Sequence, residues 1–188
     1  MEIFWNTIAR YNAATWPWQI AIVAAAAVLT VLLYLRPTQN VKRAMKLFLA
    51  GLNAWIAVVY YLVWCGQRSH SDVLALFWGI MAVIWLYDLY ADFTRFERTS
   101  RPNGFALLLY LMPLAYPLFS LARGLSFPMM TMPVMPCSVA VFTIGLMLAF
   151  THRINIFLVL FLCHWALIGL AKVYFFGIPE DFLLAAST

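Results

Sequence analysis

Charged side chains are scarce in this chain: they make up 10% of its 188 residues, and only seven of them are Asp or Glu. Soluble domains carry roughly 25% charged residues. No polar stretch of the sequence is long enough to fold as a separate water-soluble domain. The deficit excludes an ordinary soluble protein and favours a single domain over residues 1–188.

Cysteine is scarce as well. Cys65, Cys137 and Cys163 are odd in number and widely spaced, which excludes a disulfide framework and leaves room for one pair at most. The net charge is +5, but no basic patch is interleaved with aromatic residues in the way typical of nucleic-acid binding. We interpret the basic residues as topology signals and expect no nucleic-acid partner.

Apolar residues are abundant, at 65% of the chain with a mean hydropathy of +0.88. A bilayer core about 30 Å thick requires roughly 20 helical residues to cross it, and helices satisfy their own backbone hydrogen bonds in lipid. We therefore predict an all-α polytopic integral membrane protein, a six-transmembrane-helix bundle surrounded by the lipid bilayer. The spans fall at about 18–35, 44–64, 73–91, 104–121, 134–151 and 155–175.

The segment before the first span mixes apolar with polar residues from Met1 to Trp16. This mixture predicts either a short helix lying in the membrane interface or an irregular tail. It lacks the basic start and the cleavage pattern of a secretory signal, so we expect the first span to stay attached.

Lys and Arg are distributed unequally between the two sides of the six-span arrangement, eight against four. Basic residues are retained on the cytoplasmic side of a membrane. Both termini are therefore predicted outside. The richer side holds Arg36, Lys42, Arg43, Lys46, Arg95, Arg98, Arg101 and Arg153, and the poorer side holds Arg10, Arg68, Arg123 and Lys172.

Several polar residues fall inside the predicted spans, where each needs a partner or a role. Asn53 and His164 lie at comparable depth, which predicts either a hydrogen bond between two helices or a polar station on a solute or proton path. Asp88 lies one turn from Asp92, with Arg95 on much the same face. An ion network is favoured there, with cation binding as the alternative.

The fourth span carries Pro113 and Pro117, which bend a helix and free backbone carbonyls. This pair predicts either a packing shape or a gate. Lys172, in the outer part of the last span, is a further candidate for a polar lining. It could complete an anion site at the start of the fifth span, or its side chain could reach toward the interface and pair with Glu180 or Asp181.

A methionine-rich loop precedes the fifth span. Met132, Met135 and Cys137 are soft ligands of the kind that favours Cu(I), and a thiol in the first turn of a helix is more easily ionised. Met also fills gaps in apolar cores, and Pro136 simply starts a helix. Copper binding is one hypothesis and packing is the other.

No enzyme is predicted. A membrane hydrolase needs a nucleophile with its base, or a metal held by His and carboxylate ligands at helical spacing, and the sequence shows neither pattern. His70, His152 and His164 are expected at different depths, which argues against one metal site or a haem with two axial His ligands. No catalytic residue and no cofactor are assigned.

Several motifs resemble a family of small bacterial inner-membrane proteins catalogued only as a domain of unknown function. They are Trp16–Gln19, Met135–Ser138, Phe142–Leu146, Trp165–Gly169 and the Gly-Ile-Pro-Glu-Asp run Gly177–Asp181. The resemblance covers the whole chain and implies a multi-pass protein of the bacterial inner membrane. It implies no activity, and Ser138 stands where the family pattern usually has Pro.

Three functions remain open from the sequence. Kinked and polar spans favour a component of small-solute or ion transport. The absence of a convincing site favours instead a non-enzymatic membrane subunit that packs against a partner or against another copy as a homo-oligomer. Soft-metal handling at the outer Met/Cys loop is the third hypothesis.

Overall fold

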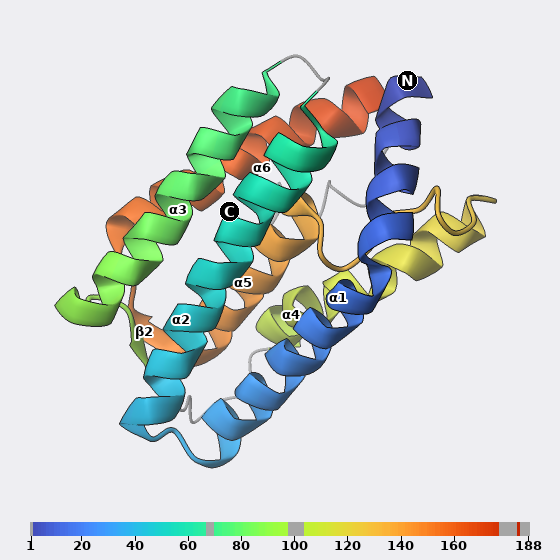
Figure 1. Ribbon diagram of the computed structural model, residues 1–188. Helices are drawn as coiled ribbons and strands as arrows, with labels where there is room; N and C mark the ends of the chain where they lie inside the picture. Colours follow the sequence, from blue (N-terminus) through green and yellow to red (C-terminus); the bar gives the residue numbers. More distant parts are fainter. Residues whose placement is uncertain (1, 67–69, 98–103, 177–183, 185–188) are drawn as a thin grey trace.

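The computed structural model describes residues 2–66, 70–97, 104–176 and 184. They form a bundle of α-helices with one small two-stranded sheet (Figure 1). The elements in chain order are α1 (Glu2–Leu35), α2 (Gln39–Trp55), η1 (Ile56–Trp64), α3 (Ser71–Ala91), β1 (Arg95–Phe96), α4 (Gly104–Ala122), α5 (Pro136–Phe150), β2 (Thr151–Arg153) and α6 (Ile156–Phe176).

The six predicted helical segments are confirmed within a few residues, apart from the start of the first. η1 continues α2 without a break but with the wider turn of a π-helix, in which the Cys65 N–H donates to the Tyr60 carbonyl at 2.9 Å. The second predicted segment is therefore one continuous helix, α-helical in its first part and π-helical in its second. Thr38 caps its N-terminus through a hydrogen bond from the Val41 N–H.

α1 corrects the expectation for the residues before the first span. They form neither a separate interfacial helix nor an irregular tail, because α1 is continuous from Glu2 to Leu35 and contains Pro17. Figure 1 shows the bend that a proline inside a helix imposes. The physical reason is that Ile8, Tyr11 and Asn12 are fully buried against the rest of the bundle, so packing keeps this segment helical.

Buried apolar residues of α2–η1, α3 and α5 make up most of the core. α2 and α3 run side by side (Figure 1), and aromatic rings fill the space toward α6. Trp78, Trp85 and Trp165 are almost completely buried. The rings of Trp78 and Trp165 meet edge to face at 5.1 Å, and those of Tyr61 and Trp165 at 6.4 Å. Bulky side chains thus occupy the centre.

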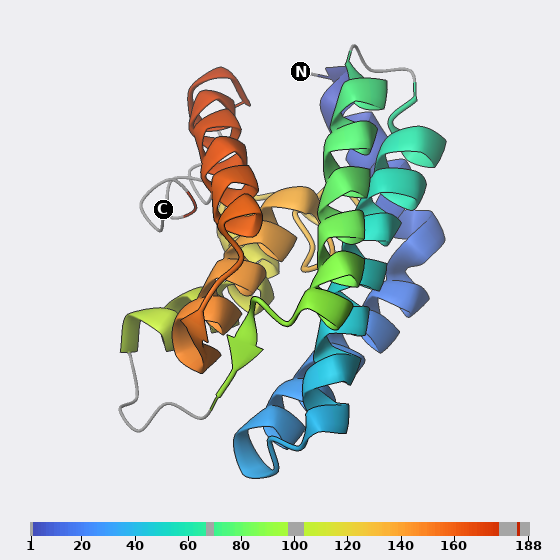
Figure 2. The same ribbon diagram turned by 90° about the vertical axis from the view of Figure 1, so that its left-hand side faces the viewer.

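α4 and α5 pack against each other, and α4 lies on the opposite side of the bundle from α3 (Figure 2). A Cβ added at Gly145 would lie 2.5 Å from the Tyr110 nitrogen and 2.9 Å from the Leu109 carbonyl carbon. Only glycine therefore allows the two backbones to approach this closely. α5 is buried along nearly its whole length, so it is the central helix of the fold.

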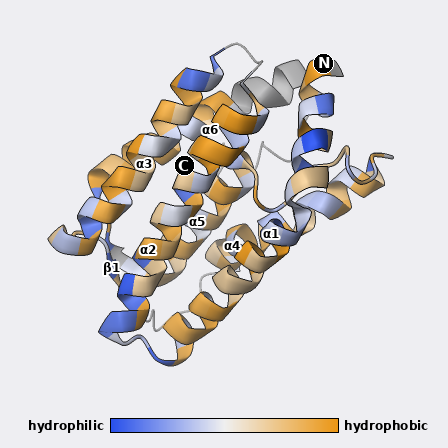
Figure 3. Ribbon diagram, viewed as in Figure 1, coloured by the Kyte–Doolittle hydropathy of each residue, from blue (hydrophilic) through white to orange (hydrophobic). Residues whose placement is uncertain are grey.

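Among the residues that the structure describes, four helical segments are long and apolar enough to cross a membrane: α1, the continuous α2–η1, α3 and α4. Apolar colour covers their middle portions, and hydrophilic residues collect toward the helix ends (Figure 3). α5 and the Ile156–Gly169 portion of α6 are shorter apolar helices. The structure thus shows an all-helical bundle with four segments of membrane-spanning length.

Candidate functional site

A buried ion cluster joins α2 to the last turn of α3. The Lys46 ammonium lies 3.0 Å from Asp88 Oδ2 and 2.7 Å from Asp92 Oδ1. Lys46 and Asp88 are only 3% and 0% exposed, whereas the Asp92 side chain is 45% exposed. Burying a charge is costly unless it is paired and hydrogen-bonded, and here each buried charge has its partner.

Asp88 also organises the chain beyond α3. Its carboxylate accepts from the Thr94 N–H at 3.1 and 3.2 Å and from Asn155 Nδ2 at 3.5 Å. The Thr94 hydroxyl in turn accepts from the Asn155 N–H at 3.2 Å. Lys46 donates to the Asp88 carbonyl at 3.0 Å, where a cation suits the negative end of a helix dipole. The cluster therefore fixes α2, α3, β1 and the start of α6 together.

A polar cavity of about 200 Å³ opens beside this cluster. Its lining combines both signs of charge, so a small polar solute or an ion pair fits it better than a single ion. Lys46 lowers the pKa of Asp92 through its hydrogen bond, so this carboxyl stays ionised more readily than usual. The lining residues are Gln39, Lys42, Lys46, Asp92, Arg95, Phe96 and Glu97.

Sequence reasoning placed Asp88, Asp92 and Arg95 in an ion network, and the structure brings Arg95 Nε to 3.5 Å from Asp92 Oδ2. It missed Lys46, which is the residue in closest contact with both carboxylates. A signal was present, because Lys46 is a lysine just inside an apolar span. Such a residue needs a carboxylate at matching depth on a neighbouring helix.

Asn53 and His164 do not pair, which corrects the expectation that they bond across two helices. Asn53 is fully buried and donates to the Leu49 carbonyl of its own helix at 2.7 Å. Among the described residues its Oδ1 has no hydrogen-bond partner. His164 is exposed, and its ring lies 5.7 Å from that of Phe77 on α3. Equal depth failed as a criterion because Asn53 faces the interior of the bundle, whereas His164 faces outward.

A polar seam on α1 was not predicted. Tyr11 donates to the Val134 carbonyl at 2.6 Å, and Asn12 donates to the carbonyls of Pro128 and Met130 at 2.9 and 2.8 Å. Gln19 donates to the Thr15 hydroxyl at 3.0 Å. The seam satisfies the carbonyls of the loop before α5 and so ties that loop to α1. Polar residues recurring every four positions were the available signal.

The Met/Cys loop is largely packed into the protein. Met135 and Cys137 are 7% and 9% exposed. The Met132 N–H lies 3.2 Å from the Met135 sulfur, and Ser138 Oγ donates to the Met132 carbonyl at 3.0 Å. The described residues contain no group of three or more His, Cys, Asp or Glu side chains that could hold a metal. Copper binding through these sulfurs stays a prediction.

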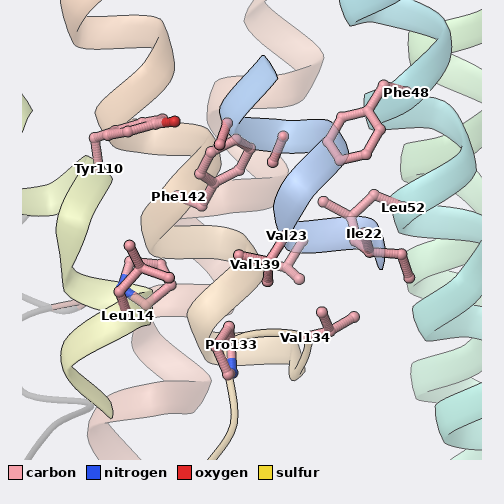
Figure 4. Close-up of a pocket in the computed structure, with 13 residues that line it drawn as sticks. Ile22, Val23, Phe48, Leu52, Tyr110, Leu114, Pro133, Val134, Val139 and Phe142 are labelled. Atoms are coloured by element: carbon pink, nitrogen blue, oxygen red, sulfur yellow. The ribbon is translucent and has the colours of Figure 1, made fainter. Parts of the chain in front are cut away.

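An apolar pocket of about 70 Å³ lies between α1, α2, α4 and α5 (Figure 4). Pro113 is buried and lines it, so the first proline of α4 shapes an internal surface; Pro117 also lies inside this helix. In Figure 4, Val23 from α1, Leu114 from α4 and Val139 from α5 surround the space. With this lining the pocket can accept only an apolar group, such as the end of a lipid chain.

Some predicted residues lie outside the part of the chain that the structure describes. Lys172 is in α6, but its side chain is outside the described part, as is that of His152. Glu180, Asp181 and the basic residues Arg68, Arg98 and Arg101 are also outside it. The proposed anion site and its alternative pairing therefore stay predictions.

No curated protein and no solved structure matches this chain. A family model described as "Family of unknown function (DUF6064)" matches residues 1–188. This confirms the resemblance noted from the sequence. The chain therefore belongs to the DUF6064 family of unknown function.

Proposed function

We propose that this protein is an integral protein of the bacterial inner membrane that crosses the bilayer six times, with both termini outside. Its outer surface supports embedding in lipid. Val28 on α1, Leu76 on α3 and Leu118 on α4 are 58%, 65% and 65% exposed. Apolar surfaces of this extent are unfavourable in water and suit an apolar solvent.

Although α5 is short, its position inside the bundle allows it to serve as one of the six membrane crossings. Its 15 residues span about 22 Å, less than the hydrocarbon core. Irregular backbone at membrane depth is tolerated where protein surrounds it, and α5 is buried inside the bundle. The Met132–Met135 segment and β2 extend the crossing at its two ends.

The distribution of charge supports the orientation. Among described residues, Arg36, Lys42 and Arg43 lie at the α1–α2 turn, and Arg95 and Arg153 lie on paired strands at the same end of the bundle. Arg10 and Arg123 belong to the opposite end. The richer end is therefore the cytoplasmic one by the positive-inside rule.

Within the membrane, the protein acts as a non-enzymatic subunit that packs against another membrane component. The single observation that carries this proposal is the contrast between its inside and its outside. Large rings such as Trp78 and Trp85 fill the centre, and the buried Lys46–Asp88 pair is fully engaged. An ionisable side chain, His164, is instead exposed on an outer helix face.

Purification from native membranes in a mild detergent, followed by mass measurement, tests this function. We expect a complex heavier than one chain of 21.5 kDa. A lone monomer in detergent and in lipid nanodiscs at all concentrations would contradict it.

Small-solute or ion transport is the second candidate, favoured by the polar cavity that opens at the charged end beside Lys46. Uptake into vesicles containing the purified protein tests it over a panel of ions and small polar solutes. Flux that depends on Lys42, which lines the cavity, but not on the exposed Arg43 would support transport. Flux equal to that of empty vesicles across the panel would remove it.

A further inference from the structure

The polar cavity beside the ion cluster is lined by some charges that are paired and by others that are not. Lys46 lies 2.7 Å from Asp92 and 3.0 Å from the buried Asp88. Lys42 is half-buried in the same lining, and its ammonium forms no hydrogen bond or ion pair with any residue that the structure describes. The same is true of the Glu97 carboxylate. One cation and one anion of the cavity are thus available to a ligand.

The periods of two elements bring these side chains together. On α2, Lys42 and Lys46 are four residues apart and share one face of the helix. From β1 onward, Arg95, Phe96 and Glu97 are exposed, buried and exposed in turn, because successive residues of an extended chain point to opposite sides. The cavity therefore lies between a pair of lysines on α2 and the outward-facing residues of the β1 segment.

The pairing of the two strands adds positive charge at this site. Arg95 is the partner of Arg153 across the β1–β2 ladder. Side chains directly opposite each other on antiparallel strands lie about 5 Å apart, and like charges there repel. Arg95 has one ion pair, from its Nε to Asp92 at 3.5 Å, and Arg153 has none with any described residue. An anion bound beside these guanidinium groups would relieve the repulsion.

The cavity lies where the bundle would meet lipid headgroups. Lys42 is in the first turns of α2, and Arg95 follows the last residue of α3 by four positions. This is the hydrophilic end of both helices (Figure 3), and it is the cytoplasmic end in the proposed orientation. Basic pockets between membrane helices on that side bind phosphate-bearing headgroups. With about 200 Å³, against roughly 300–1,000 Å³ for pockets that hold whole drug-sized ligands, the cavity suits a small polar group.

We propose that the cavity binds the headgroup of a phospholipid that carries a primary amine, with its phosphate between Lys42 and Arg95 and its ammonium at Glu97. This inference rests on the proposed embedding in the bilayer and names a lipid partner. Lysine and arginine are the usual partners of phosphate, and a primary ammonium has three donors for a carboxylate. Such a headgroup pairs with both kinds of available charge, whereas a simple anion would leave Glu97 without a cation.

The test measures the binding of single lipids to the full chain in a mild detergent, by native mass spectrometry over a titration with each lipid. The probes are phosphatidylethanolamine and phosphatidylcholine, whose methylated amine has the same charge but no N–H donor. We expect phosphatidylethanolamine to bind about tenfold more tightly, the scale of one hydrogen bond to a charged group. Equal affinities of the two lipids would overturn the inference.

Two variants separate the two ends of the headgroup. Lys42→Met should weaken the binding of both lipids about tenfold, because it removes a charged contact to the phosphate. Glu97→Met should remove most of the preference for the primary amine. Arg43→Met, on the exposed face of α2, is the matched control and should bind both lipids as the wild type does.

The variants at residues 42 and 97 should keep the thermal unfolding temperature of the wild type, because neither side chain has an ion pair with a described residue. Lipid binding that is insensitive to both Lys42→Met and Glu97→Met would overturn the inference.

Soluble ligands distinguish a lipid from a free phosphate ester. Glycerophosphoethanolamine or inorganic phosphate is added to the lipid-bound protein at the concentration of the lipid. We expect the lipid to stay bound, because its acyl chains also contact the apolar helices. Displacement by glycerophosphoethanolamine would assign the cavity to a soluble ester and overturn the lipid assignment alone. Recovery of the protein from cells without detergent would contradict the proposed embedding as well.

Discussion

Two ionisable residues, Lys46 at the charged end of α2–α3 and His164 on the outer face of α6, lie in opposite environments. Lys46 is buried with two carboxylates within 3.0 Å, whereas His164 faces outward with an aromatic ring as its neighbour. The difference teaches that the paired charges of Lys46 hold helices of the monomer together, whereas the outward-facing His164 makes no such contribution; its role toward a partner is our proposal. Four sets of measurements on variants test how far this contrast extends.

Lys46→Met should have the largest effect. It leaves Asp88 buried without its cation, and removing one member of a buried ion pair costs about 3–5 kcal/mol. Thermal unfolding in detergent, followed by circular dichroism, measures the loss. His164→Leu should leave the unfolding temperature unchanged at concentrations where the protein is monomeric. Arg43→Met on the exposed face of α2 is the control. Equal losses for Lys46→Met and His164→Leu would break the comparison.

Gly145→Ala should follow in size. The new methyl group would meet backbone atoms of α4 at 2.5 and 2.9 Å, so the helices must separate, at a cost of about 1–3 kcal/mol. Gly79→Ala on α3 is the matched control, because its Cβ would have nothing within 4 Å. A gain of up to about 1 kcal/mol is expected there from helix propensity. The unfolding temperatures of the two variants should move in opposite directions.

Asn53→Leu should be neutral or slightly stabilising, by about 1 kcal/mol at most. The change removes a buried amide whose Oδ1 has no described partner, and its Nδ2 bonds only within its own helix. Asn12→Leu is the contrast and should destabilise, because it leaves two loop carbonyls without their donor. Chemical denaturation compares the two variants. A marked loss for Asn53→Leu would assign that amide a partner or a role in the interior.

Acidity should give the smallest effect. The pKa of Asp92 is lowered in the folded protein, chiefly by its hydrogen bond from Lys46. Its contribution to stability is therefore present above the ordinary carboxyl pKa of about 4 and is lost as the pH falls through the lowered folded value. The unfolding temperature of the wild type should fall more steeply below about pH 4 than that of Asp92→Asn. Parallel pH profiles would show that the pair contributes nothing.

The helices could be predicted from the sequence because runs of apolar residues mark them, and the structure places their ends within a few residues of the prediction except at the start of α1. The start of α1 could not, since the burial of Tyr11 and Asn12 depends on a loop more than a hundred residues away. Lys46 and Asp88 are 42 residues apart, and their contact requires knowing that α2 and α3 are antiparallel neighbours. Asn53 and His164 show the limit of arguing from depth, because depth does not determine which way a side chain faces.

The most direct test of the account is the side of the membrane on which each end of the bundle lies. Single cysteines are introduced at Arg43 on the charged end, and at Asp72 and Ser126 on the opposite end, in a chain whose native cysteines are alanine. A membrane-impermeant maleimide applied to intact spheroplasts should label Asp72→Cys and Ser126→Cys at once, and Arg43→Cys only after the membrane is permeabilised. Labelling of Arg43→Cys in intact spheroplasts, or of Asp72→Cys without Ser126→Cys, would contradict the six-crossing arrangement.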